Sequence, residues 1–294
     1  MKSIINKLQS KARKIANIYM EKTFQPYAIP QNVDGVTFNF LIGDLDSKNH
    51  FDLISQLNMP KNADQEIDSS DEVGEMAFLK SKVIGSGDVV FDCGGNHGWT
   101  SILFSKWIGN TGKVVTFEPN IRNVKIIQKN LEINNINNVV VEFKAVGASQ
   151  GKVKIFRKSN ASVIPQDWIT MLISGNLLYG LDEVELIALD RYVEQNQILP
   201  TAIKIDVEGY EIEVLKGAKN VLQTLPKLGI EIHTDILHEH NTSIKELLSF
   251  IDRNHYQCWL KPEGAKAPVE FDFQQEIKVR SHLFAIPKDK VTSI

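Results

Sequence analysis

The stretch DVVFDCGGNHGWTSILFSKW, residues 88–107, constrains the fold of this 294-residue chain more than any other. An apolar run ends at Asp92, a glycine-rich turn follows, and apolar residues at helical spacing begin near Trp99. A buried strand that leads through glycines into a helix is typical of an open α/β sheet, whose ligands bind outside the carboxyl ends of the strands. We therefore predict a ligand-binding loop between Asp92 and Gly98.

The spacing of the glycines indicates which ligand this loop binds. A dinucleotide fingerprint requires G-x-G-x-x-G, so that a pyrophosphate can rest on the helix N-terminus. Gly94, Gly95 and Gly98 do not have that spacing, and the turn follows an acid, which gives D-x-G-x-x-x-G. A carboxylate repels phosphate but attracts a cofactor with a cationic amino-acid tail. The loop therefore favours a sulfonium cofactor. The alternative is that the glycines only form a tight turn between strand and helix and bind no ligand.

Strands and helices alternate from residue 82 to the end of the chain. Apolar runs predict strands at VVFD, KVVTFE, NVVVEFKAV, TAIKIDV, LGIEIH and HLFAIP, and further strands at KVKIFR and VELIALDRYV. Helical spacing predicts helices near residues 72–81 and at 99–107, 121–133, 209–224 and 243–254. Such alternation predicts a parallel sheet covered on both faces.

The ends of the next strands predict the rest of a nucleoside site. Glu118 ends the second strand, where an acid can accept hydrogen bonds from ribose hydroxyls. Lys144 and Ala145 end the third strand, where the edge of an adenine would lie. The predicted cofactor-binding residues are Asp92, Gly94, Gly95, Asn96, His97, Gly98, Glu118, Lys144, Ala145 and Asp206.

Acids and a histidine at the ends of the fourth and fifth strands predict the catalytic groups. Asp206 and Glu208 close TAIKIDVE, and His233 closes LGIEIH on the same side of that strand as Glu231. A hydroxyl acceptor needs a base within hydrogen-bond reach, and we rank His233 first, then Asp206 and Glu208. Their spacing identifies no metal, and none is predicted. Glu211, which opens the next helix, is assigned only to the helix dipole.

Composition excludes several classes of protein. A formal net charge of −3 gives no basic footprint for nucleic acid. The two cysteines are too few for a disulfide framework. No apolar run approaches the roughly 18 residues of a spanning helix, and the charged N-terminus lacks a secretory signal. We expect a cytoplasmic protein.

Residues 1–24 have an apolar face and a lysine-rich face at helical spacing. Two roles stay open for this predicted helix, which are weak contact with an anionic membrane surface and docking on its own domain or on a second copy of the chain. We predict an N-terminal extension over residues 1–71 and one further domain over 72–294, interrupted by an insertion at 158–183. Asn160, Ser162, Trp168 and Tyr179 of that insertion are candidates for contact with the acceptor.

Five blocks of the sequence together resemble the FkbM family of methyltransferases. They are FDCGGNHGWTS, FEPNIRNVKIIQKNLEINN, ALDRYV, IKIDVEGYEIEVLKGA and IEIH, in the order of the family. His97 departs from the family pattern, which more often has a hydrophobic residue before the glycine. The resemblance implies a Rossmann-like fold, which is a seven-stranded, mostly parallel sheet with an antiparallel last strand. It also implies S-adenosyl-L-methionine as cofactor.

The resemblance further implies methyl transfer to a hydroxyl oxygen, often on a sugar or natural product. The expected partner is thus a small-molecule or glycan hydroxyl acceptor. Two rival functions stay open, which are a dinucleotide-dependent oxidoreductase and a non-catalytic nucleoside-binding protein that has kept the fold.

Overall fold

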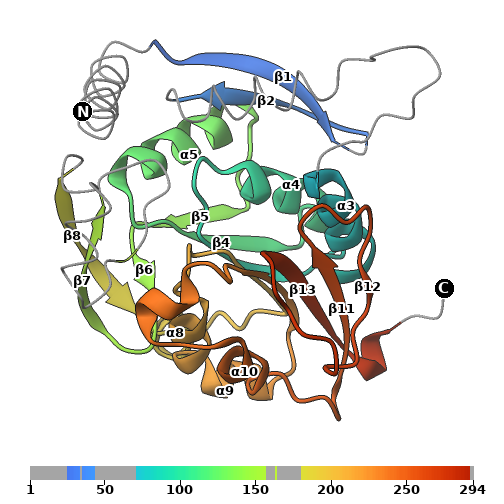
Figure 1. Ribbon diagram of the computed structural model, residues 1–294. Coiled ribbons are helices and arrows are strands. Elements are labelled where there is room, and N and C mark those ends of the chain that lie inside the picture. Colours follow the sequence, from blue (N-terminus) through green and yellow to red (C-terminus); the bar gives the residue numbers. More distant parts are fainter. Residues whose placement is uncertain (1–24, 34, 44–70, 157–162, 164–179, 292–294) are drawn as a thin grey trace, which may run out of the picture.

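An eight-stranded sheet forms the centre of the computed structural model, which describes residues 25–33, 35–43, 71–156, 163 and 180–291 (Figure 1). In spatial order its strands are β12 (Val269–Glu270), β11 (Tyr256–Pro262), β13 (Ser281–Pro287), β10 (Lys227–Ile232), β9 (Ala202–Ile205), β3 (Val89–Cys93), β4 (Lys113–Phe117) and β5 (Val139–Glu142). The five strands from β10 to β5 run parallel, and β13 is antiparallel to both of its neighbours. The predicted Rossmann-like sheet with an antiparallel last strand is therefore confirmed, with β12 as a short addition at its edge.

Helices cover both faces of this sheet because successive strand residues point to opposite sides. In β3, Val90 packs into one core and Phe91 into the other. One face carries α3 (Asp71–Phe78), the π-helix η1 (Leu79–Val83), α4 (Trp99–Ile108) and α5 (Ile121–Ile133); the other carries α7 (Leu189–Asn196), α8 (Glu211–Lys216), α9 (Lys219–Gln223), η3 (Leu237–His240) and α10 (Ile244–Leu248). Burial on both faces explains why the strand sequences read as continuous apolar runs.

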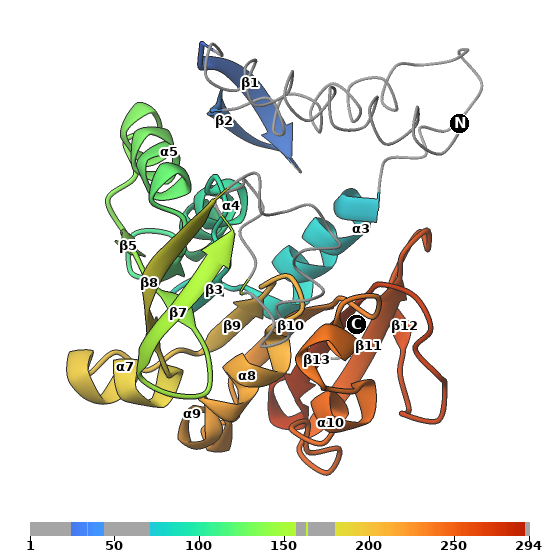
Figure 2. The ribbon, with the colours of Figure 1, turned by 60° about the vertical axis from the view of Figure 1, so that its left-hand side comes forward.

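A two-stranded hairpin, β1 (Tyr27–Val33) and β2 (Val36–Ile42), lies over α4 and α5 in both views (Figure 2). Phe40 packs edge-on against Trp99, with 5.2 Å between ring centroids. The Leu41 N–H donates to Asn130 Oδ1 of α5 at 2.7 Å. These contacts attach the hairpin to the helices that cover the main sheet, while the predicted boundary at residue 71 stays a prediction.

The sequence predicts no strand where β1 lies, because Pro26 and Pro30 are residues that interrupt a strand. Pro30 is tolerated because, among the described strands, β1 pairs with β2 alone and is an edge strand. The N–H groups on the open side of an edge strand make no ladder bonds, so a proline can stand there. The apolar run VTFNFLIG predicts a strand from the sequence, and β2 confirms it. Residues 1–24, which carry the predicted basic helix, lie outside the described residues.

A separate three-stranded sheet, in the order β6 (Ala145–Val146), β8 (Leu181–Ile187) and β7 (Gly151–Phe156), precedes β9 in the chain. Two predictions were wrong here. NVVVEFKAV is two strands, since the chain leaves the main sheet after Glu142 and pairs with β8. The end of VELIALDRYV is helix α7, whose Leu189 and Tyr192 are buried three residues apart. The four acceptor candidates of the insertion lie outside the described residues.

Two further differences concern the C-terminal half. The predicted helix at 209–224 is divided into α8 and α9 at Gly217, where an added Cβ would meet the Gly147 carbonyl oxygen at 2.0 Å. β11 was not predicted, and it lies between β12 and β13 at the antiparallel side of the sheet. In the part of the chain that the structure describes, no helix combines the length and the apolar character needed to cross a membrane.

Candidate functional site

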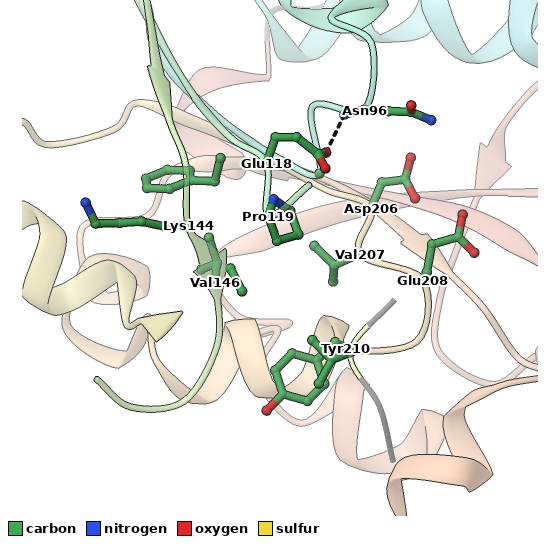
Figure 3. A pocket seen from close by; sticks show the side chains of 13 residues that line it. Asn96, Glu118, Pro119, Lys144, Val146, Asp206, Val207, Glu208 and Tyr210 are labelled. Atoms are coloured by element: carbon green, nitrogen blue, oxygen red, sulfur yellow. Dashed lines mark hydrogen bonds between the residues drawn. The ribbon is translucent and has the colours of Figure 1, made fainter. Parts of the chain in front are cut away.

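A pocket of about 560 Å³, including the solvent at its mouth, lies at the carboxyl ends of the parallel strands (Figure 3). It is lined by Gly94, Asn96, Phe117, Glu118, Pro119, Lys144, Ala145, Val146, Val163, Asp206, Val207, Glu208 and Tyr210. Figure 3 shows Lys144 and Val146 on one side and Asp206 and Glu208 on the other, with Glu118 and Pro119 between them. The sheet thus brings together residues from four strand ends.

The predicted cofactor residues divide into two groups. Gly94, Asn96, Glu118, Lys144, Ala145 and Asp206 line the pocket. Asp92, Gly95, His97 and Gly98 are not part of its lining. The residues that the sequence analysis missed are mainly apolar: Phe117, Pro119, Val146, Val163, Val207 and Tyr210. Their signal was weak, because apolar residues at strand ends also serve the core.

The loop after β3 needs glycine for its own packing. Gly94 has φ +93°, and a Cβ there would lie 1.8 Å from the Asp206 carbonyl oxygen. A Cβ on Gly95 would lie 2.2 Å from Thr116 Cγ2. The glycines therefore let the loop approach β9 and β4 closely, a requirement of the protein itself in addition to any approach to a ligand.

Asp92 lies beneath the loop and is fully buried. Its Oδ2 accepts hydrogen bonds from Thr100 Oγ1 at 2.9 Å and Ser101 Oγ at 2.6 Å. Its Oδ1 has no hydrogen-bond partner among the residues that the structure describes. Burial raises the pKa of Asp92, and Lys204 on the adjacent strand acts against that rise. An orphaned buried acceptor beside a ligand loop is the kind of atom that an ammonium group would satisfy.

Glu118 is held in place from three directions. Its carboxylate accepts from the Asn96 N–H and the Asn120 N–H, each at 2.8 Å, and from Asn123 Nδ2 at 3.2 Å. His97 contacts Asn123 Oδ1 at 3.2 Å, so it supports Glu118 from behind and lies away from the pocket edge. Burial raises the pKa of Glu118 to about 8 in spite of these donors.

Asp206 and Glu208 supply the negative charge of the opposite side. Asp206 Oδ2 accepts a hydrogen bond from the buried Lys204 at 2.7 Å. Burial raises the pKa of Asp206, but Lys204 and His233 lower it more, and the net shift is downward. Glu208 has φ +53°, a strained conformation for this residue type that concentrates at functional sites.

His233 lies beside these two acids but is not part of the pocket lining. Its Nε2 is 3.8 Å from Asp206 Oδ1 and 3.7 Å from Glu208 Oε2. Its Nδ1 lies 2.8 Å from Oε1 of Glu211, and both residues are almost completely buried. The assignment of Glu211 to the helix dipole alone was therefore incomplete: Oε1 does accept the Gly209 N–H before α8, but it also holds the imidazole.

Arg280, which precedes β13, completes this group. Its Nη2 lies 2.7 Å from His233 Nε2, and its Nε donates to Glu231 Oε1. By distance, Asp206, Glu208 and His233 bring oxygen and nitrogen atoms within 4.8 Å of one another. Both imidazole nitrogens make hydrogen bonds here, Nδ1 with Glu211 and Nε2 with Arg280, so a metal ion would have to displace Arg280 to reach Nε2.

The pocket fits a nucleoside with a cationic tail. Glu118 presents a carboxylate to ribose hydroxyls, and Phe117, Pro119 and Val146 give apolar walls for a base. Asp92 has a free acceptor oxygen below the loop. Among the described residues that line the pocket, Lys144 is the one basic side chain and stands against the acids Glu118, Asp206 and Glu208, a balance that favours a cationic ligand group over a pyrophosphate.

Comparison with known proteins identifies the family. The model of the Methyltransferase FkbM domain matches residues 92–258, which is more than half of the chain. The hexuronic acid methyltransferase AglP of Haloferax volcanii is 40% identical over 58 residues, which are 19% of this chain and 24% of AglP. The chain thus spans about a quarter of that relative's length.

Two solved methyltransferases are similar over a larger part of the chain. The methyltransferase FkbM of Methylobacillus flagellatus is 18% identical, with a TM-score of 0.44, and the match covers 80% of this chain and 50% of that one. A SAM-dependent O-methyltransferase of Thermotoga maritima is 12% identical, with a TM-score of 0.41, over 88% and 77% of the two chains. TM-scores this low say nothing about the acceptor. The family match is sufficient: the chain belongs to the FkbM family of methyltransferases, and its methyl donor is S-adenosylmethionine.

Proposed function

We propose that this methyltransferase acts on a hydroxyl oxygen of a sugar, glycan or natural product, with His233 as general base. The observation that best supports this proposal is the buried pair of Glu211 and His233, which lies beside the acids of the pocket. Glu211 Oε1 is 2.8 Å from His233 Nδ1. A carboxylate-held imidazole is a common means of removing a hydroxyl proton. The resemblance of one segment to a hexuronic acid methyltransferase supports a sugar-like acceptor.

The residues of the chain divide the work as follows. Bound S-adenosylmethionine supplies an electrophilic methyl group on a sulfonium. Glu118 would hold the ribose, and Asp92 would attract the cationic tail. Asp206 and Glu208 would orient the acceptor, and His233 would receive its proton. Alignment of the reacting atoms then supplies much of the rate.

The other functions have less support. Family membership and the glycine spacing both argue against a dinucleotide oxidoreductase. The positive φ of Glu208 beside the buried Glu211–His233 pair favours a catalytic role over nucleoside binding alone. We also place the reaction in the cytoplasm, since Cys93 and Cys258 are unpaired thiols.

The proposal is tested by transfer of a labelled methyl group from S-adenosylmethionine to a panel of hexoses, uronic acids and glycans. We expect the wild type to label a hydroxyl, and His233→Asn to lower kcat by about 10²–10⁴-fold with the affinity for S-adenosylhomocysteine unchanged. His255→Asn is the control, because His255 is exposed and pairs only with Asp252. Equal loss in both variants, or label on nitrogen or carbon, would contradict the proposal.

Nucleoside binding is expected to strengthen with pH. Because Glu118 has a pKa of about 8, it is mostly protonated at pH 7 and ionises as the pH rises, which improves it as an acceptor for ribose hydroxyls. We expect up to about tenfold tighter binding at pH 9 than at pH 7. Calorimetry with 5′-methylthioadenosine measures this binding, because that ligand lacks the α-amino group of the methionine part and has no group that titrates between pH 7 and pH 9. Glu118→Gln should bind more weakly and show no slope, and a slope that persists in this variant would exclude Glu118 as its source.

A further inference from the structure

The proposed base cannot reach an acceptor in the arrangement seen here. Arg280 Nη2 lies 2.7 Å from His233 Nε2, and Nε2 is the nitrogen next to the pocket acids. An imidazole nitrogen has one lone pair, so a hydroxyl proton and a guanidinium N–H compete for it. An acceptor therefore has to displace Nη2 before His233 can act.

The same contact fixes the protonation state of His233. A guanidinium has no acceptor atom, so a contact of 2.7 Å requires Nε2 to carry no hydrogen. The Nδ1–H then donates to Glu211. Burial lowers the pKa of His233, yet the bond to Glu211 and the charges of Asp206 and Glu231 raise it to about 9. A pKa of about 9 would leave the imidazole charged at pH 7, whereas a guanidinium 2.7 Å from Nε2 disfavours that charge. We infer that the Arg280 contact outweighs the nearby acids and keeps the imidazole neutral while Arg280 stays in place.

We propose that Glu211 and Arg280 are positioning residues of His233: Glu211 fixes the tautomer, and Arg280 covers Nε2 until the acceptor hydroxyl takes its place. The inference rests on the proposed role of His233 in methyl transfer. Arg280 is suited to this because it is anchored through Nε on Glu231 and its side chain is 39% exposed. Nη2 can turn away while the Nε bond is kept.

Displacement of Nη2 strengthens the base at the moment the acceptor binds. The carboxylates of Asp206, Glu208 and Glu231 stand 3.7–3.9 Å from Nε2 and favour a proton there once the guanidinium has moved. The acceptor proton passes to Nε2, and the oxygen lone pair forms the bond to the methyl carbon as the carbon–sulfur bond breaks. The electron pair of that bond stays on sulfur, and the imidazolium is held by Glu211.

Nuclear magnetic resonance of ¹⁵N-labelled protein tests the proposed roles of Glu211 and Arg280, and it needs no acceptor substrate. The ¹⁵N resonances of the His233 imidazole are assigned by their absence in His233→Asn. Their chemical shifts show which of the two nitrogens carries a proton at each pH. In the wild type we expect a proton on Nδ1 alone at pH 7. Arg280→Met should raise the pKa of His233 by about one unit or more, because a nearby positive charge is gone. Glu211→Gln keeps the shape of the side chain and should lower the pKa and weaken the tautomer preference.

Arg191→Met is the matched control, since that guanidinium pairs with Glu194 on the surface. A proton on Nε2 of the wild type at pH 7, or equal His233 titration in the Arg280 and Arg191 variants, would overturn the inference. Once an acceptor substrate is known, the pH dependence of kcat/KM gives a second test. In Arg280→Met the acid limb of this profile should move to higher pH by the same amount as the pKa of His233 measured by nuclear magnetic resonance. A protein that labels no hydroxyl would refute the proposed function alone, because the titration is measured on the free protein.

Discussion

Gly94→Ala is expected to abolish cofactor binding and to lower the unfolding midpoint strongly. Gly94 has φ +93°, which costs a residue with a side chain about 1–2 kcal/mol. The larger effect is steric, because the new Cβ would lie 1.8 Å from the carbonyl oxygen of Asp206 and 2.9 Å from its carbonyl carbon. Backbone atoms on both sides cannot move apart without opening the pocket between the loop and β9. We expect at least a hundredfold loss of affinity for S-adenosylhomocysteine by calorimetry, or no folded protein.

Gly87→Ala separates the clash from the backbone strain. Gly87 precedes the same strand at its other end and has φ +80°, but an added Cβ would meet only Thr111 Oγ1 at 3.7 Å. This control should lose stability of about 1–2 kcal/mol and keep its cofactor affinity. Equal unfolding midpoints and equal affinities of the two alanine variants would show that close approach to β9 is not what requires Gly94.

Much of the site could be predicted because parallel strands end at one edge. Asp206, Glu208 and His233 follow two different strands, yet their polar atoms lie within 4.8 Å of one another. Glu118 reaches the same pocket from β4. The strand ends and the rule that ligands bind there are sufficient to group these residues. That reasoning does not distinguish residues that line the pocket from those buried just below it, such as Asp92.

Glu211 was within reach of sequence reasoning. Val214, Leu215 and Ala218 follow it at spacings of three, four and seven residues, and all of them are buried with it. A carboxylate on the apolar face of a helix requires a partner, which is a stronger signal than its position in the first turn. Position along the helix, on which the dipole interaction depends, does not reveal the bond to His233.

Arg280 could not have been found in the same way. It lies 47 residues after His233, in a segment with no motif, and it meets the imidazole through the register of β10 with β13. That register pairs Ile232 with Ser281, so the next residue on each strand, His233 and Arg280, also comes to lie opposite. Antiparallel register depends on packing over the whole edge of the sheet, and local sequence patterns do not contain it.

Lys204→Met is expected to destabilise the protein by about 3–5 kcal/mol at neutral pH, because it leaves buried negative charge without a partner. Lys204 is 5% exposed, lies opposite Asp92 in the sheet register and donates to Asp206 at 2.7 Å. Methionine keeps most of the length of the side chain, so the change is mainly one of charge. Urea unfolding measures it, with Lys152→Met as the control, since Lys152 pairs with Glu183 in solvent and its loss should leave the midpoint unchanged.

The pH dependence of this destabilisation distinguishes charge from packing. Burial already raises the pKa of Asp92 and Lys204 acts against that rise, so in Lys204→Met this carboxyl binds a proton still more readily in the folded than in the unfolded protein. Asp206 loses the charge that lowers its pKa most, so its pKa also rises. Unfolding then releases protons, and the stability of the variant falls as the pH rises. We expect the difference from the wild type to be largest near about pH 8 and to narrow toward about pH 5, where the folded carboxyls can be neutral. Adding Asp206→Asn should recover part of the loss. A difference that does not vary with pH and is not reduced by Asp206→Asn would mean that Lys204 stabilises the strand by packing, and that the acids of the pocket do not depend on its charge.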